Sequence, residues 1–274
     1  KRNFNYIVLY GQPMTGKTKI LYRLSEVLDD DYVPLIVTVQ GSSLSNLDYF
    51  AFDLAFQLTI KFNDWAKRHK ISAPLDVPKW KEFKKGIVER VFREHWQHLR
   101  QSAGQRQPVV MFDEIERLLD PIHKSDERIL DFIYNFVRNP ENGYFVLAGS
   151  ERIHYAKNER FSSLIGRGRS IPVRYLEEDV TKSVFLAAQD YFTFETDALE
   201  TILALCDGHP RVLQHVYEVV ASTAVQPDKG CKIRTSDIEP IVADVIERVE
   251  DALWALAIRL SEHERCVVKL VSCD

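Results

Sequence analysis

One short segment near the start of the chain, GQPMTGKT at 11–18, limits the possible folds more than any other feature. It fits the pattern G-x-x-x-x-G-K-[ST] in full, an apolar run precedes it, and a helix-like sequence follows it. In such a setting the glycines let backbone N–H groups point inward around a phosphate, and the helix N-terminus adds a partial positive charge. The segment therefore predicts a phosphate-binding loop between a strand and a helix.

The last residues of this segment match the chemistry of a bound nucleoside triphosphate. Lys17 would reach the β- and γ-phosphates as a point charge, and the Thr18 hydroxyl would ligate Mg²⁺. An exposed lysine in a Gly/Pro turn is the alternative interpretation, which the flanking strand and helix disfavour. The residues predicted to contact the nucleotide here are Gly11, Gln12, Pro13, Met14, Thr15, Gly16, Lys17, Thr18 and Lys19.

A second apolar run, PVVMF at 108–112, ends in two adjacent acids, Asp113 and Glu114. In a phosphate-loop fold this strand tip lies beside the loop, so Asp113 can bind Mg²⁺ together with Thr18 while Glu114 polarises an attacking water. An enzyme that phosphorylates a metabolite must exclude water, whereas Glu114 favours water as the nucleophile. Hydrolysis is therefore predicted rather than phosphoryl transfer.

Ser150 follows the apolar run YFVLAG and is expected at the same edge of the sheet. Its hydroxyl could contact the γ-phosphate or the attacking water, or it could cap a helix, and these two roles are compatible.

A basic segment, RFSSLIGRGR at 160–169, offers a further charge. The glycines around Arg167 predict a mobile, exposed loop whose guanidinium could stabilise developing phosphate charge in a neighbouring subunit. Arg169 is the second choice for this role. A solvated basic loop without such a role remains an open alternative.

Strand and helix signals alternate through the first two thirds of the chain. The predicted strands are 6–10, 32–40, 108–113, 144–149 and 170–176. They predict an α/β fold, with a five-stranded parallel sheet in a three-layer core. Beyond Glu177 the strand signals disappear, and the predicted helices are 178–190, 196–206, 210–224 and 236–259. The expected domains are a core at 1–176, an all-helical domain at 177–260, and the start of a further domain at 261–274.

Composition narrows the function classes. Of 274 residues 45% are hydrophobic and the formal net charge is −4, so no overall positive field favours nucleic acid or an anionic membrane. No apolar run approaches the ~20 residues of a membrane span. The four cysteines stand singly without metal-ligand spacing, which predicts reduced thiols in a cytoplasmic protein.

These motifs in this order resemble the STAND ATPases (signal-transduction ATPases with numerous associated domains) of the AAA+ superfamily, especially the bacterial and archaeal branch, whose members also resemble origin-recognition ATPases. The resemblance rests on GQPMTGKT, VVMFDEIERL, FVLAGSER and GHPRVLQ, and it covers nearly the whole chain.

The resemblance implies roles for particular residues. Lys17 and Thr18 would bind ATP or ADP with Mg²⁺, and Asp113 and Glu114 would act in metal binding and hydrolysis. Ser150 would be the polar sensor of the phosphate. His209 and Pro210, in the glycine-x-proline motif of a helical lid, would face the nucleotide, although Gly208 and Pro210 also suit an ordinary junction between two helices.

The resemblance also implies a switch. In this family the ADP form is closed, and ATP opens the lid, permits homo-oligomerisation and activates an effector domain or protein, whose identity the sequence does not reveal. The segment LSEHERCVVKLVS at 260–272 resembles the start of a winged helix, and the first and last residues predict a piece of a longer protein.

Two alternatives stay open. Origin-recognition and transposition ATPases share this core, and a basic stretch consists of Lys79, Lys81, Lys84, Lys85, Arg90 and Arg93. Interspersed Glu82, Glu89 and Glu94 favour a solvated helix face over DNA binding. An idle scaffold that binds nucleotide without turnover is the other alternative, which the intact Lys17, Asp113 and Glu114 disfavour.

Overall fold

The computed structural model describes residues 5–39, 44–71, 74–85, 87–119, 126–187, 192–224 and 231–257. The chain divides into two compact units, Lys1–Arg174 and Tyr175–Asp274, which are taken separately below. The predicted winged-helix start at 261–274 lies outside the described residues. None of the described helices is long and apolar enough to cross a membrane.

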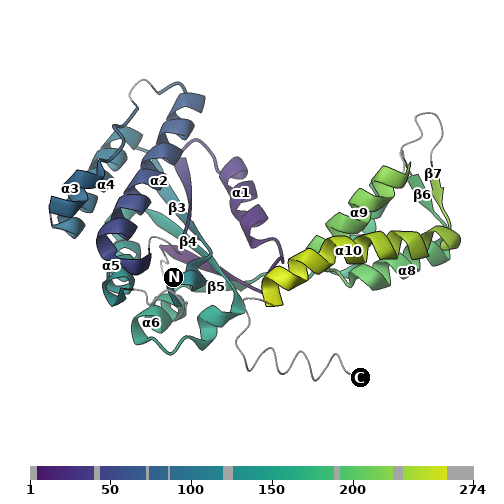
Figure 1. Cartoon of the computed structure of the whole chain (residues 1–274). Coiled ribbons are helices and arrows are strands. Elements are labelled where there is room, and N and C mark those ends of the chain that lie inside the picture. The colour runs from purple at the N-terminus through teal and green to yellow at the C-terminus, as the bar shows by residue number, and fades with distance from the viewer. Residues whose placement is uncertain are drawn as a thin grey trace. The chain divides into compact units, whose positions relative to one another are not determined.

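A five-stranded parallel sheet forms the centre of the first unit, with strand order β2-β3-β4-β1-β5 (Figure 1). The strands are β1 (Tyr6–Tyr10), β2 (Tyr32–Thr38), β3 (Gln107–Asp113), β4 (Tyr144–Gly149) and β5 (Arg169–Pro172). In β3 every residue after Gln107 is buried, as expected for a parallel strand covered on both faces. Pro34 is tolerated in β2 because that strand lies at the edge of the sheet. The predicted α/β fold is confirmed.

Helices cover the two faces of this sheet unequally. They are α1 (Lys17–Val27), α2 (Leu47–Arg68), α3 (Trp80–Lys85), α4 (Val88–Ala103), α5 (Glu127–Arg138) and α6 (Glu159–Arg167). The larger core cluster joins α2 to α6 with one face, and a smaller cluster around Leu21 of α1 covers the other. Two short 3₁₀ helices, η2 (Ile115–Leu119) and η5 (Glu151–Tyr155), follow β3 and β4 directly.

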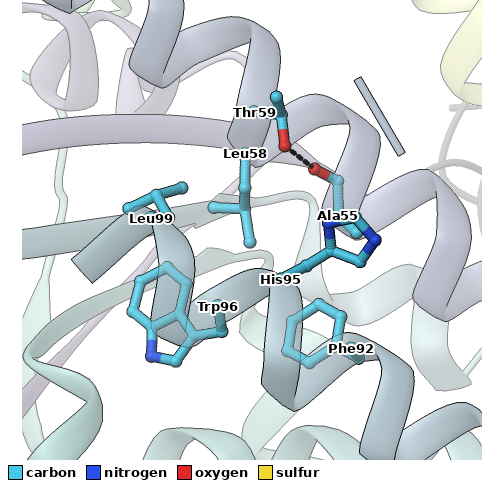
Figure 2. A pocket seen from close by; sticks show the side chains of 7 residues that line it. All are labelled: Ala55, Leu58, Thr59, Phe92, His95, Trp96 and Leu99. Atoms are coloured by element: carbon cyan, nitrogen blue, oxygen red, sulfur yellow. Dashed lines mark hydrogen bonds between the residues drawn. The ribbon is translucent and has the colours of Figure 1, made fainter. Parts of the chain in front are cut away.

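A small cavity of about 10 Å³ lies between α2 and α4 (Figure 2). Its lining is Ala55, Leu58, Thr59, Phe92, His95, Trp96 and Leu99. The Thr59 hydroxyl donates a hydrogen bond back to the Ala55 carbonyl oxygen at 2.8 Å. A space of this size holds at most about one water molecule. The cavity is therefore a packing gap in the core and no site for a nucleotide.

The second unit contains α7 (Glu178–Leu186), α8 (Thr196–Cys206), α9 (Pro210–Ala224) and α10 (Ile238–Ala257). It also contains two parallel strands, β6 (Phe192–Phe194) and β7 (Cys231–Ile233), so the prediction of an all-helical domain is wrong. Each strand has only three residues, too few to show an alternating pattern. Phe192 and Ile233 are buried in the core of this unit, and their packing stabilises the pairing.

Candidate active site

The segment 11–18 forms a tight loop between β1 and α1, and its glycines are required by the geometry. Gly16 has a φ of 91°, in the left-handed region that favours glycine. A Cβ on Gly11 would lie 2.1 Å from the Val173 carbonyl oxygen. The buried Thr15 hydroxyl donates to the Gln12 carbonyl oxygen at 2.9 Å and fixes the turn from inside. The backbone therefore has the close curvature that a phosphate cradle needs.

Lys17 begins α1 and turns its side chain back over the loop. Its Nζ donates to the carbonyl oxygens of Gly11 at 3.0 Å and Gln12 at 2.6 Å. Burial lowers the pKa of Lys17, while the carboxylates of Glu116 and Asp113 oppose that shift. The Lys17 ammonium is partly desolvated, and its acceptors in the loop are uncharged oxygens. Phosphate oxygens accept hydrogen bonds more strongly, so they can replace these acceptors when a nucleotide binds.

Thr18 and Asp113 meet although they are far apart in sequence. The Thr18 hydroxyl donates to Asp113 Oδ2 at 2.7 Å, which joins the start of α1 to the tip of β3. A hydroxyl and a carboxylate are the hard oxygen ligands that Mg²⁺ prefers, usually completed by phosphates and water. The described residues include no group of three or more His, Cys, Asp or Glu side chains suited to a metal. The pair therefore fits a Mg²⁺ ion that arrives with a nucleotide.

Glu114 occupies an unusual backbone conformation. Its φ is 56°, a left-handed value that is uncommon for a residue with a side chain, and its N–H donates to Asp113 Oδ1 at 3.0 Å. Backbone strain of this kind clusters at functional sites. The carboxylate is 37% exposed and forms an ion pair with Arg117 of η2. It is therefore accessible to a water molecule beside the loop.

Ser150 stands at the N-terminus of η5, directly after β4. Its backbone carbonyl oxygen accepts from the Ile153 N–H at 3.2 Å, but its side chain makes no capping hydrogen bond. The hydroxyl is buried and has no hydrogen-bond partner among the described residues. Helix capping therefore does not account for this hydroxyl.

Glu116 belongs to the same region, and the sequence reasoning missed it. It lies on η2 between the tips of β3 and β4, and a Cβ on Gly149 would be 3.1 Å from its Oε2. Its carboxylate is the strongest charged influence on the pKa of Lys17. In the sequence, Glu116 is visible only as a third acid two residues after Glu114, and none of the motifs used to predict the site includes that position.

Arg167 lies away from these residues within the chain. It is the exposed last residue of α6, and Arg169 in β5 pairs with Ile7 near the start of β1. The phosphate loop follows the opposite end of β1, after Tyr10. The expected loop is wrong, because Glu159–Arg167 form α6. A Cβ on Gly168 would lie 2.5 Å from the Tyr6 ring, so close packing requires this glycine.

His209 and Pro210 begin α9 in the second unit. The His209 Nδ1 accepts from the Arg211 N–H at 3.2 Å, so a hydrogen is left for Nε2 in the neutral ring. Burial lowers the pKa of His209, which favours that neutral form. Its ring contacts Tyr175 with centroids 4.9 Å apart. His209 therefore presents a neutral N–H donor, and its ring and that of Tyr175 are available for contact, but the motif carries no positive charge on this histidine.

A pocket of about 270 Å³ lies beside this motif within the second unit. Its lining is Leu176, Glu178, Thr181, Glu200, Leu203, Ala204, Asp207 and Gly208. Three of these residues are acids, and their negative charge opposes the binding of phosphates. The pocket is therefore a poor nucleotide site.

Replacing Gly208 with alanine is expected to destabilise the second unit by about 3 kcal/mol. Gly208 has a φ of 67°, and an added Cβ would lie 2.0 Å from the Leu176 carbonyl oxygen. Hydrogen exchange of the α8 and α9 amides measures the loss. The matched control is Gly166→Ala in α6, where an added Cβ meets nothing within 4 Å. Equal exchange in both variants would contradict the role given to Gly208.

Comparisons with known proteins agree with this geometry. A family model described as an ATPase domain predominantly from Archaea matches residues 1–216. No curated protein sequence matches the chain closely enough to count as a relative. The solved Walker-type ATPase of Pyrococcus abyssi is similar, with a TM-score of 0.66 and 17% identity, over 92% of this chain and 69% of that one.

Two further solved proteins are also similar in structure. The Aeropyrum pernix Orc1 protein in complex with DNA has a TM-score of 0.56 and 17% identity, over 96% of this chain and 64% of its own. The Cdc6p protein of Pyrobaculum aerophilum has a TM-score of 0.50 and 16% identity, over 81% of this chain and 56% of its own. At these identities the likeness shows the shared fold.

Proposed function

The chain belongs to the family of ATPase domains found predominantly in Archaea, and we propose that it is a slow, regulatory ATPase whose nucleotide state controls the relation of its two units. The observation that carries the proposal is the hydrogen bond from Thr18 to Asp113, which joins the phosphate loop to the acid pair. Family and fold together support a P-loop ATPase of AAA+ type.

The chemistry follows from the residues at this edge of the sheet. Lys17 and the loop amides would bind the β- and γ-phosphates, and Thr18 and Asp113 would hold Mg²⁺, which neutralises charge that develops on the phosphates. Glu114 would accept a proton from water as the water oxygen attacks the γ-phosphorus. The bond to the β–γ bridging oxygen breaks, and ADP and inorganic phosphate result.

Two further residues would complete the site. The buried Ser150 hydroxyl, which has no partner among the described residues, is suited to contact the γ-phosphate as a sensor. Arg167 is exposed at the other end of the sheet from the loop, so it would act on the nucleotide of a neighbouring copy. We therefore propose a homo-oligomer in the ATP state.

The switch depends on the second unit. His209 and Pro210 would contact the bound nucleotide as part of a lid, while Lys17 and Thr18 bind it from the first unit. A ligand that two compact units share can bias their relative orientation. We assign the chain on this basis to the STAND type, with an effector of unknown identity.

A DNA-associated ATPase is the second candidate. The similarity to an Orc1 protein solved with DNA favours it. Against it, Arg90 on α4 is paired with Glu94 at 3.6 Å, and Glu82 of α3 contacts His95 of α4 at 3.4 Å, so this surface has mixed charge. Duplex binding that weakens steeply with salt would favour this second candidate.

Phosphate release from ATP tests the proposed chemistry. The wild-type protein is expected to release phosphate slowly with Mg²⁺ and at background rate with EDTA, because Mg²⁺ held by Thr18 and Asp113 would neutralise the charge that develops on the phosphates. A radiolabelled ATP assay measures both rates. Equal rates with Mg²⁺ and with EDTA would remove the metal-assisted mechanism.

A further inference from the structure

Glu116 is a half-buried acid that the chemistry proposed above does not use. Its Oε2 is buried and has no hydrogen-bond partner among the described residues. Burial raises the pKa of Glu116, while the neighbouring backbone amides and the charge of Lys17 oppose the rise and the charge of Glu114 adds to it. A carboxylate with an unsatisfied oxygen costs folding free energy. Packing alone therefore does not explain an acid at this position.

The carboxylate of Glu116 lies against the end of β4. A Cβ on Gly149 would be 3.1 Å from Glu116 Oε2 and 2.9 Å from side-chain carbons of both Ile115 and Ile153. Burial raises the pKa of Glu116, and the neighbouring backbone amide of Ser150 opposes that rise. Glu116 therefore lies against Gly149, the residue directly before Ser150, whose hydroxyl is buried without a partner among the described residues.

The same carboxylate acts on the phosphate loop. Among the charged groups that influence the pKa of Lys17, Glu116 has the largest effect, ahead of Asp113 and Glu151. Lys17 must leave the carbonyl oxygens of the loop when phosphates replace them as acceptors. A fixed negative charge nearby limits where the ammonium group can go.

We propose that Glu116 is a positioning residue that lies against the backbone at the end of β4 and attracts the Lys17 ammonium, so that the Ser150 hydroxyl and the Lys17 ammonium meet the γ-phosphate together. The proposal rests on the proposed function, because it needs a nucleoside triphosphate in the loop. It assigns Glu116 to recognition of the γ-phosphate, whereas Glu114 acts on water. ADP lacks the γ-phosphate, so a comparison of the affinities for an ATP analogue and for ADP tests whether Glu116 acts in γ-phosphate recognition.

The test compares the affinities of Glu116→Gln and Glu116→Ala for a non-hydrolysable ATP analogue and for ADP. Loss of a group that orients site residues costs roughly 10- to 100-fold in comparable sites. Glu116→Ala is expected near the upper value for the analogue. Glu116→Gln, which keeps the size of the side chain and an oxygen beside the end of β4, is expected near the lower one. Affinity for ADP is expected to fall by no more than about threefold, because ADP keeps only the β-phosphate contact of Lys17 and lacks the γ-phosphate that both groups meet.

Glu151→Gln is the matched control, since Glu151 also influences Lys17 but is exposed. It is expected to bind both nucleotides like the wild type. Equal losses for analogue and ADP, or no loss in either Glu116 variant, would overturn the positioning role. Binding is measured without turnover, so a wild type that binds both nucleotides but hydrolyses no ATP would contradict only the proposed function.

Stability against pH separates positioning from a structural role. Because the folded pKa of Glu116 is raised, the folded state favours its protonated form. Wild type is therefore penalised as pH rises through that folded pKa, and the penalty disappears below the ordinary glutamate pKa. Glu116→Gln carries no charge, so it is expected to be more stable than wild type at pH 8 and equal at pH 4. A variant less stable than wild type at pH 8 would contradict the proposal and indicate a structural role.

Discussion

Replacing Lys17 with alanine is expected to weaken ATP binding by about 100-fold, which corresponds to about 2.8 kcal/mol. The ammonium group is partly buried and bonded to the carbonyl oxygens of Gly11 and Gln12, so it already lies inside the loop. Charge-assisted hydrogen bonds to phosphate are about twice as strong as neutral ones. Isothermal titration calorimetry with a non-hydrolysable ATP analogue measures the loss.

The matched control for Lys17→Ala is Arg23→Ala. Arg23 lies on the same helix, α1, and its guanidinium pairs with Glu26 in solvent. Removing it is expected to leave the affinity for the analogue unchanged, because exposed ion pairs contribute little. Binding of the analogue by Lys17→Ala within threefold of wild type would contradict the phosphate-loop assignment.

Replacing Glu114 with glutamine is expected to lower the rate of phosphate release by about 100-fold or more, with little change in ATP affinity. The carboxylate is accessible, and glutamine keeps its size but accepts no proton from water. Single-turnover phosphate release with bound radiolabelled ATP measures the chemical step apart from binding.

The control for Glu114→Gln is Glu94→Gln on α4. Glu94 is an exposed acid in an ion pair with Arg90, and its loss is expected to leave the rate unchanged. An unaltered rate in Glu114→Gln would remove this residue from the proposed mechanism. A rate lowered equally in both variants would point to a general loss of folded protein.

The part of the site that follows strand tips could be predicted from the sequence. In a parallel sheet the carboxyl ends of neighbouring strands meet at one edge, so the loop after β1 and the acids after β3 had to come together. The 2.7 Å bond between Thr18 and Asp113 confirms that they do. Long buried strands such as β3 are visible as apolar runs, which is why the α/β core could also be predicted.

The features that were missed depend on packing between distant segments. Glu116 acquires its surroundings from the Gly149 backbone and from Lys17, and neither lies at a fixed spacing from it in sequence. The pairing of β6 with β7 joins two three-residue strands that are far apart in the chain, so no local sequence pattern predicts it. Gly168 was interpreted as a source of mobility, because a sequence does not show that the Tyr6 ring lies against it.

We propose that the nucleotide controls the relative orientation of the two units. Small-angle X-ray scattering combined with light scattering tests this control most directly. The protein is measured saturated with ADP and then with a non-hydrolysable ATP analogue. A lid that responds to the γ-phosphate predicts a different scattering curve and a higher mass with the analogue. Identical curves and identical masses, with both nucleotides shown to be bound, would contradict the claim.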